Sequence, residues 1–324
     1  MLKRILAASL MLGGMAVAVP AQDRLVLGLQ ESGTALWEIE AIRNLGLDEK
    51  HGVTLEIRPL ADSRAGQIAL QAGAVDVILS DFTWVSAQRH FGSDFTMVPH
   101  SLAVGGLIVP AESAIETIED LAGKTIGVAG GPVDKSFVAL QAYYAALTGE
   151  ALTDLAETRF GAPPLINELL ASGGVDAGLN FWHWNARAKA AGMREVISVA
   201  EMFQGLGLSE PPPLLGWTFS DAVASEKHDA LVKFLDASFE AKAALLSDDA
   251  VWDDLASIMG AAEDTSLFAH LRDGYRAGIV QRYDPDDTLL AELAFGLLAE
   301  FGGTDVVGEQ TELAEGTFWE GYRK

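Results

Sequence analysis

Short apolar runs alternate with amphipathic segments along this chain, and the alternation starts twice. Apolar runs at 24–29, 53–60 and 75–80 have the length and composition of strands. The segment 35–46 repeats its apolar residues every three positions, as one helical face requires. The same order resumes after residue 118. Alternating strands and helices form largely parallel sheets covered by helices, so the pattern predicts an α/β fold.

An offset of one hundred residues aligns the two series. QAGAVDVILSDFTWVSAQRHFG (71–92) and ASGGVDAGLNFWHWNARAKAAG (171–192) share Gly, Val, Asp, Leu and Trp at matched positions. Each segment predicts a helix end, a capping glycine, a strand, an aromatic loop and a second helix. We therefore expect two similar lobes, each with a mainly parallel sheet flanked by helices.

Two extended segments rich in Pro and Gly, 97–110 and 211–220, are suited to cross between the lobes and to form a hinge. The segment 222–301 is mainly amphipathic helix, and we expect it to pack on lobe 1. The predicted division is a signal peptide at 1–21, lobe 1 at 22–103 plus 215–324, and lobe 2 at 104–214.

The first 21 residues have the three parts of a secretory signal: a basic start, an apolar run and small residues before Gln22. We expect cleavage after Ala21 and a periplasmic location.

The chain has no cysteine, so a large core and not disulfides must stabilise it. A net charge of −24 argues against a nucleic-acid partner. We expect a monomer that binds a small molecule and carries no cofactor.

Ligands of open α/β sheets bind beyond the carboxyl ends of the strands. The loops expected there are 30–34, 61–66, 80–84, 129–136, 161–164 and 180–184. Most are rich in residues that cap helices, and converging helix N-termini would hold an anion without a lysine. In the alternative interpretation, serines such as Ser32, Ser63 and Ser136 only cap or flank helices.

Tryptophans gather in or just after these loops and in one crossover: Trp37, Trp84, Trp182, Trp184 and Trp217. Each would pack in the core or a lid, or stack on a flat or cationic ligand. If the chain stays extended through FWHW (181–184), Trp182 and Trp184 share one side. We expect Trp182 and Asn180 to face the ligand.

No pattern in the sequence demands an enzyme or a metal site. The six histidines lack the paired spacing of a zinc site, and neither a G-x-S-x-G elbow nor a phosphate-binding GK[ST] occurs. The acidic clusters at 247–254 and 282–288 lack the spacing of an EF-hand loop and are best interpreted as solvated helix starts.

Four features together resemble the periplasmic solute-binding proteins of ABC importers for nitrate, sulfonates, taurine and thiamine-pyrimidine precursors. They are the export signal, GLDEKHGVTLEI, ALQAGAVDVILSD and IEDLAGKTIGVAGG. The resemblance implies the two-lobed type II binding-protein fold, which closes on one small molecule and presents it to a membrane permease. The ligand contacts that it implies are Ser32, Gly33, Thr34, Ser80, Asp81, Trp84, Gly130, Gly131, Ser136, Asn180 and Trp182.

Trp37, Ser63 and Trp217 complete the set of candidate ligand-binding residues. The aromatic loop favours an aromatic or heterocyclic solute, with or without an acidic group, over bare taurine or nitrate. One alternative is an enzyme of the thiamine-pyrimidine synthase type that uses Asp81, His183 or Glu31 as acid or base, but those enzymes carry a cysteine-rich motif. A periplasmic sensor or accessory subunit is the other alternative.

Overall fold

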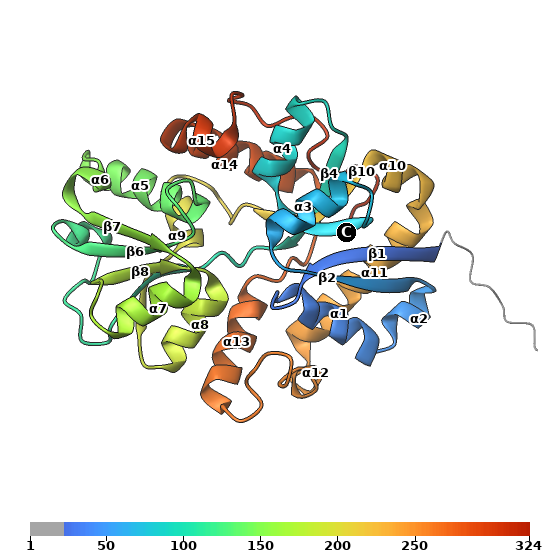
Figure 1. Ribbon diagram of the computed structural model, residues 1–324, viewed down its shortest axis with the longest axis horizontal. Coiled ribbons are helices and arrows are strands. Elements are labelled where there is room, and N and C mark those ends of the chain that lie inside the picture. Colours follow the sequence, from blue (N-terminus) through green and yellow to red (C-terminus); the bar gives the residue numbers. More distant parts are fainter. Residues whose placement is uncertain (1–22) are drawn as a thin grey trace, which may run out of the picture.

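The computed structural model describes residues 23–324, which form two lobes, each built on a five-stranded sheet (Figure 1). The predicted signal peptide at 1–21 lies outside the described residues. Within residues 23–324, no helix is both long and apolar enough to span a membrane.

Lobe 1 carries the first sheet, whose strands are β1 (Arg24–Gln30), β2 (Thr54–Leu60), β3 (Val77–Asp81), β4 (Phe95–Ser101) and β10 (Leu215–Ser220). Its helices are α1 (Ala35–Asn44), α2 (Leu47–His51), α3 (Ser63–Gln71), α4 (Phe82–His90), α10 (Asp221–Glu226), α11 (His228–Ser247) and α12 (Ala250–Asp253).

Lobe 2 carries the second sheet, whose strands are β5 (Gly106–Val109), β6 (Thr125–Ala129), β7 (Glu157–Gly161), β8 (Ala177–Asn180) and β9 (Arg194–Ser198). Its helices are a short 3₁₀ helix (Ile118–Leu121), α5 (Lys135–Thr148), α6 (Leu152–Leu155), α7 (Pro163–Ala171), α8 (Trp182–Ala190) and α9 (Val199–Gly205). The C-terminal helices are α13 (Thr265–Ala277), α14 (Pro285–Gly302) and α15 (Thr304–Val307).

The two sheets have the same topology. The strand orders are β2-β1-β3-β10-β4 and β7-β6-β8-β5-β9. In each sheet one strand is antiparallel to its neighbours, β10 in the first and β5 in the second. Both of these strands enter directly from the other lobe, through the crossovers at 206–214 and 102–105. The predicted α/β fold of two mainly parallel sheets is confirmed.

The two segments aligned at an offset of one hundred residues make equivalent hydrogen bonds in the two lobes. The Asp76 carboxylate accepts a hydrogen bond from the backbone N–H of Val26 at 2.8 Å, and Asp176 accepts one from Thr125 at the same distance. Each aspartate therefore joins the start of the third strand of its lobe to the first strand. Gly73 and Gly173 both have positive φ, which favours glycine where the preceding helix ends.

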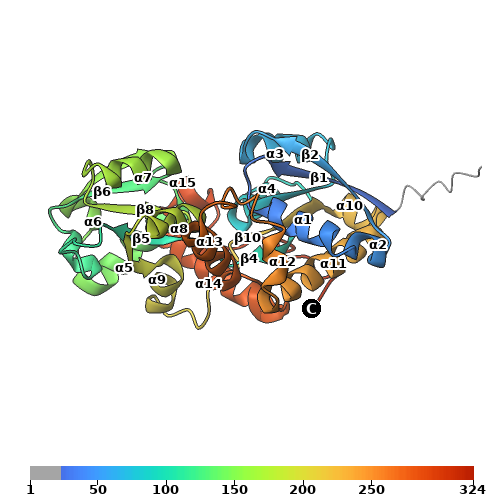
Figure 2. The same ribbon diagram turned by 90° about the horizontal axis from the view of Figure 1, so that it is seen from below.

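The C-terminal helices lie between the lobes, whereas we expected the segment 222–301 to pack on lobe 1. Helix α11 does pack on α1 and α2, but α13 packs on α8 and α14 packs on α5, both in lobe 2 (Figures 1 and 2). Phe295 of α14 also contacts Phe82 of α4, with ring centroids 6.2 Å apart. Hydrophobic pattern alone predicts that a helix has a buried face but not which lobe covers it.

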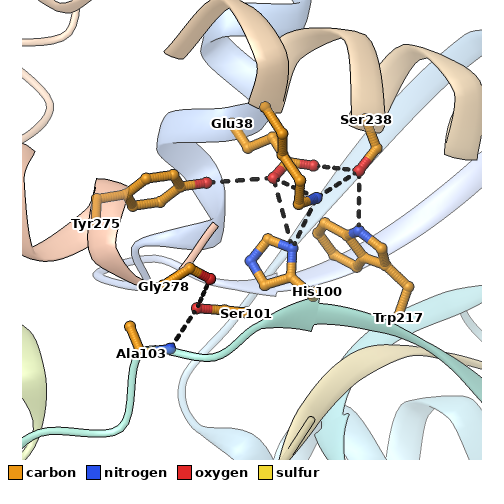
Figure 3. Close-up of polar contacts among 9 residues, drawn as sticks. Glu38, His100, Ser101, Ala103, Trp217, Ser238, Tyr275 and Gly278 are labelled. Carbon is orange, nitrogen blue, oxygen red and sulfur yellow. Dashed lines mark hydrogen bonds and ion pairs between the residues drawn. The ribbon is translucent and has the colours of Figure 1, made fainter. Parts of the chain in front are cut away.

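A polar network lies in the interior of lobe 1 beside the first crossover (Figure 3). Lys242 Nζ lies 2.7 Å from a Glu38 oxygen, and neither side chain is more than 2% exposed. His100, Ser238 and the Tyr275 hydroxyl complete the contacts of this carboxylate. Tyr275 belongs to α13, so the network joins that helix to lobe 1.

Candidate functional site

A cavity of about 420 Å³ lies between the two lobes. This volume is within the range of small-molecule sites. Its walls come from the ends of β1 and β3 and the starts of α1 and α3 in lobe 1, and from the starts of α5 and α8 in lobe 2. Ala103, Val104 and Leu214 of the crossovers also line it. The site therefore lies at the carboxyl edges of both sheets, next to the hinge.

Seven of the predicted ligand-binding residues line this cavity. They are Gly33, Thr34, Ser63, Ser80, Asp81, Ser136 and Trp182. Each of them lies at or next to the junction between a strand and the following helix. Ligands of open α/β sheets bind at such junctions.

The other seven are not among the lining residues: Ser32, Trp37, Trp84, Gly130, Gly131, Asn180 and Trp217. Trp217 is fully buried in the core, where its indole N–H donates to Ser238. Trp84 stacks on Phe95. Ser32, Gly130 and Gly131 lie in loops that contribute neighbouring residues to the cavity.

Asn180 has a structural role that differs from the predicted ligand contact. It is 2% exposed, its amide donates to the Pro163 carbonyl and to Asn167, and its carbonyl oxygen accepts from the Phe181 N–H. These three hydrogen bonds tie the end of β8 to α7 and to the start of α8, so every polar atom of this side chain has a partner within the protein.

The FWHW loop is helical and not extended. Helix α8 begins at Trp182, so Trp182 and Trp184 lie about 200° apart around the helix and not on one side. Trp182 lines the cavity and contacts Trp37 and Tyr275 edge to face, whereas Trp184 lies against Arg187 outside it. The shared-side prediction is wrong because it assumed that the strand conformation continued past Asn180.

Three charged lining residues are absent from the predicted set, Asp62, Asp134 and Lys135, and Lys135 is the one cation among them. It begins α5 of lobe 2, and its ammonium lies 3.3 Å from Asp81 Oδ1 of lobe 1. This ion pair crosses the cavity and links the lobes. Lys135 lies next to Ser136 in the loop 129–136, which was predicted to lie at the ligand site. Its place in that loop could have identified it.

Each of three lining aspartates caps a helix. Asp62, Asp81 and Asp134 accept backbone hydrogen bonds at the starts of α3, α4 and α5, at 2.8–2.9 Å. Burial raises the pKa of Asp81, but the charge of Lys135 and the hydrogen bonds from Thr83 and Trp84 outweigh it and hold that pKa below its usual range. Burial raises the pKa of Asp134.

His183 faces the cavity from the first turn of α8. Burial, assisted by the charge of Arg187, lowers its pKa to about 4, so the imidazole is neutral at neutral pH. Within residues 23–324, no group of three or more His, Asp and Glu side chains has metal-binding geometry. The acidic clusters near Asp248 and Asp286 lie at helix starts, where Asp248 accepts from the Ala250 N–H and Asp284 from the Asp286 N–H.

Two similar α/β lobes, two crossovers and a lined cavity between the lobes define the fold of a periplasmic solute-binding protein. Residues 43–249 match the family described as NMT1/THI5 like, and this match covers more than half of the chain. The chain belongs to that family. Comparison of the sequence with curated proteins gives no match.

Solved structures share this fold at low identity. The periplasmic aliphatic sulphonate-binding protein SsuA from Escherichia coli has 17% identity and a TM-score of 0.72, over 92% of this chain and 98% of that one. SsuA from Xanthomonas axonopodis pv. citri, bound to MOPS, has 18% identity and a TM-score of 0.69 over the same shares. A mutant of the desulfurization enzyme DszB in complex with biphenyl-2-sulfinic acid has 18% identity and a TM-score of 0.61, over 91% and 98%.

Proposed function

We propose that the protein is the periplasmic receptor of an ABC importer, which closes on one small organic solute and delivers it to a permease in the inner membrane. The cavity lined from both lobes carries this proposal, because its walls include both crossovers and a ligand there touches both sides of a hinge. Family membership and the shared fold of sulfonate-binding proteins support it. In this proposal the signal peptide directs export and is cleaved after Ala21, and the mature protein acts as a monomer.

The solute is a sulfonate-like anion or a heteroaromatic compound. Leu29, Leu60, Ile78 and Leu79 supply apolar wall from lobe 1, and Trp182 supplies an aromatic surface from lobe 2. A planar ring fits these surfaces by stacking and apolar contact. Thr34 and the first turn of α8 present helix starts that have no side-chain cap, which supply N–H donors for acceptor atoms of the solute.

Thermal-shift screening of the purified protein against sulfonates, pyrimidines, flavins and aromatic acids tests the proposal. A ligand at 100 times its dissociation constant adds about 2.7 kcal/mol of apparent stability. Mass spectrometry of the recovered ligand should show it chemically unchanged. A screen in which no compound raises the melting temperature would contradict the receptor function.

Tryptophan fluorescence supplies the matched control. We expect Trp182→Phe to abolish most of the ligand-dependent change, because Trp182 lines the cavity and contacts Trp37 across the lobes. Trp184→Phe should leave the change intact, since Trp184 lies outside the cavity on the same helix. Equal loss in both variants would show that the signal does not report on this cavity.

An enzyme on the same scaffold is the second candidate, because the desulfurization enzyme shares this fold and a neutral His183 faces the cavity. It predicts conversion of a bound solute, and a His183→Ala variant that binds the solute without converting it. Glu31 is exposed and is not among the lining residues, so His183 and Asp81 are the acid and base candidates that the cavity offers.

A further inference from the structure

The cavity between the lobes carries an excess of negative charge. Its charged lining residues are three carboxylates, Asp62, Asp81 and Asp134, and one ammonium, Lys135. His183 adds no charge at neutral pH. A sulfonate or carboxylate that entered this space would meet more anionic than cationic groups at short range, which disfavours its charged form.

The one lysine of the cavity is already engaged. Its ammonium lies 3.3 Å from Asp81 Oδ1, and Lys135 belongs to lobe 2 whereas Asp81 belongs to lobe 1. An anion that used this ammonium would have to share it with a carboxylate that the fold holds in place. Asp81 is so held because the same Oδ1 also accepts hydrogen bonds from the Thr83 hydroxyl and from the Trp84 N–H.

One carboxylate oxygen of Asp81 nevertheless has no hydrogen-bond partner among residues 23–324. All of its hydrogen bonds and its ion pair within residues 23–324 use Oδ1, and Oδ2 has no partner there. The Asp81 side chain is 22% exposed, so a solute in the cavity can reach it. A free carboxylate oxygen accepts hydrogen bonds and attracts cations, and it offers nothing to an anion.

The helix starts of the cavity point to the same conclusion. We expected converging helix N-termini to hold an anion, but α3, α4 and α5 take carboxylates of the chain itself, Asp62, Asp81 and Asp134. Each aspartate satisfies backbone N–H groups and offsets the partial positive charge of its helix. The donors at these three helix starts are therefore occupied, and of the described helices only α1 and α8 start without a side-chain cap at the cavity.

We propose that Asp81 is a specificity-determining residue and that the cavity selects an aromatic or heteroaromatic solute with a cationic nitrogen, excluding sulfonates and carboxylates. This inference rests on the proposed receptor function and narrows its two solute classes to the heteroaromatic one. The cationic group hydrogen-bonds to Asp81 Oδ2 beside Lys135, and the ring lies against Trp182 and the leucines of lobe 1. The fold is thus shared with sulfonate-binding proteins, while the charge of the site is opposite to what a sulfonate requires.

Calorimetric titration with matched sets of probes tests the charge preference. Each set holds the ring constant and varies the charge: benzamidinium, benzamide and benzoate, with equivalent sets on pyridine, imidazole and cyclohexane frames, and with benzenesulfonate added. We expect the cation of a set to bind at least tenfold more tightly than its neutral partner, and the anions to bind most weakly. An anion that binds more tightly than the cation of its set would overturn the inference.

Variants locate the preference at Asp81. Asp81→Asn keeps an oxygen acceptor for the cap of α4 but removes the charge, and we expect it to weaken cation binding at least tenfold. Lys135→Met removes the competing ammonium and should strengthen cation binding. The exposed Glu226→Gln serves as the matched control and should leave every affinity unchanged. Unchanged cation affinity in Asp81→Asn, with a normal melting curve, would also overturn the inference.

The two proposals fail in different ways. If anions bind and cations do not, the protein remains a receptor and only the charge selection is wrong. If no probe of any set binds at millimolar concentration and none changes the tryptophan fluorescence, the cavity is not a solute site, and both proposals fall.

Discussion

Glu38 and Lys242 form an ion pair in the interior of lobe 1, where desolvation opposes both charges. Burial raises the pKa of Glu38, but Lys242 and His100 outweigh it, so that pKa lies below its usual range. The carboxylate also accepts hydrogen bonds from Ser238 and Tyr275, which satisfy its remaining lone pairs. The pair is therefore stable only as a unit.

Removing both partners of this ion pair should cost less than the sum of the two single removals. We expect Glu38→Gln or Lys242→Met to lower the free energy of unfolding by about 3–5 kcal/mol, because each leaves a buried charge unpaired. The double variant should lose less than the sum of the two. Urea denaturation of the four proteins measures the coupling, and additive losses would contradict a tightly coupled pair.

His100 should make the protein sensitive to mild acid. Burial lowers its pKa to about 3, whereas the pKa of an unfolded histidine is about 6.5. The unfolded state then binds more protons between these values, so the stability held above pH 6.5 is lost as the pH falls toward 3. The slope for one group approaches about 1.4 kcal/mol per pH unit.

We expect His100→Gln to flatten the dependence of the unfolding free energy on pH between 7 and 5. The exposed His228→Gln at the start of α11 is the control and should retain the slope of the parent. A variant at His100 with the parent slope would show that this imidazole titrates normally in the folded state.

Strands β5 and β10, which enter from the other lobe, each carry a glycine where the backbone of a neighbouring strand approaches closely. A Cβ on Gly216 would lie 2.6 Å from the Val98 carbonyl oxygen, and one on Gly106 would lie 2.6 Å from that of Ile197. Gly216 lies beside the register shift between β10 and β4, and Gly106 is the first residue of β5. Both glycines lie close to a crossover. Side chains are excluded here by neighbouring backbone, which cannot move aside cheaply.

Gly216→Ala should therefore destabilise the protein by about 1–3 kcal/mol, the range for overpacked interiors. Gly296→Ala on the exposed face of α14 meets no atom within 4 Å and should instead stabilise the helix by up to about 1 kcal/mol. Thermal unfolding of both variants compares the two effects, and similar shifts would refute the close-approach argument.

Most of the elements could be predicted from periodicity and from capping glycines, and the offset of one hundred residues correctly paired β3 with β8 and α4 with α8. Local patterns carry that information because strand and helix periods are local properties. The destinations of α13 and α14 could not be predicted, since each packs on partners far away in the sequence.

The candidate site was predictable at the level of loops but not of side chains. Five of the six predicted loops contribute residues to the cavity, all except 161–164, and loop 129–136 contains Lys135. Whether a residue in such a loop faces the cavity depends on where its helix begins, as Trp182 and Trp184 show. The family resemblance selected Asn180, and the gathering of tryptophans at loops and a crossover selected Trp217. The α8 junction requires Asn180 for hydrogen bonding, and the core requires Trp217 for packing.

The whole molecule is strongly acidic, with a net charge of −24. Self-repulsion of this charge opposes the compact state, and added salt screens it. We expect the melting temperature at pH 7 to rise as NaCl increases from about 20 to 300 mM, where the Debye length falls below about 10 Å. KCl should act equally, and a falling melting temperature would show that screened ion pairs dominate.

The C-terminal helices constrain how the lobes move. Tyr275 of α13 donates to Glu38 in lobe 1, while Gly274 of the same helix lies against Trp182 in lobe 2. Helix α14 similarly contacts α4 and α5. Any opening at the two crossovers must therefore also shift these helices against at least one lobe.

Because β10 reaches lobe 1 only after the whole of lobe 2 in the sequence, the two sheets can form their complete sets of strand pairs only in one order. All five strands of the second sheet lie within residues 106–198, whereas the first sheet needs β10 at Leu215–Ser220 between β3 and β4. A chain that emerges with its N-terminus first has therefore produced every strand of lobe 2 before lobe 1 can close its sheet. The lobe that begins the sequence is the last to finish, and until then the edges of β3 and β4 stay unpaired and open to aggregation.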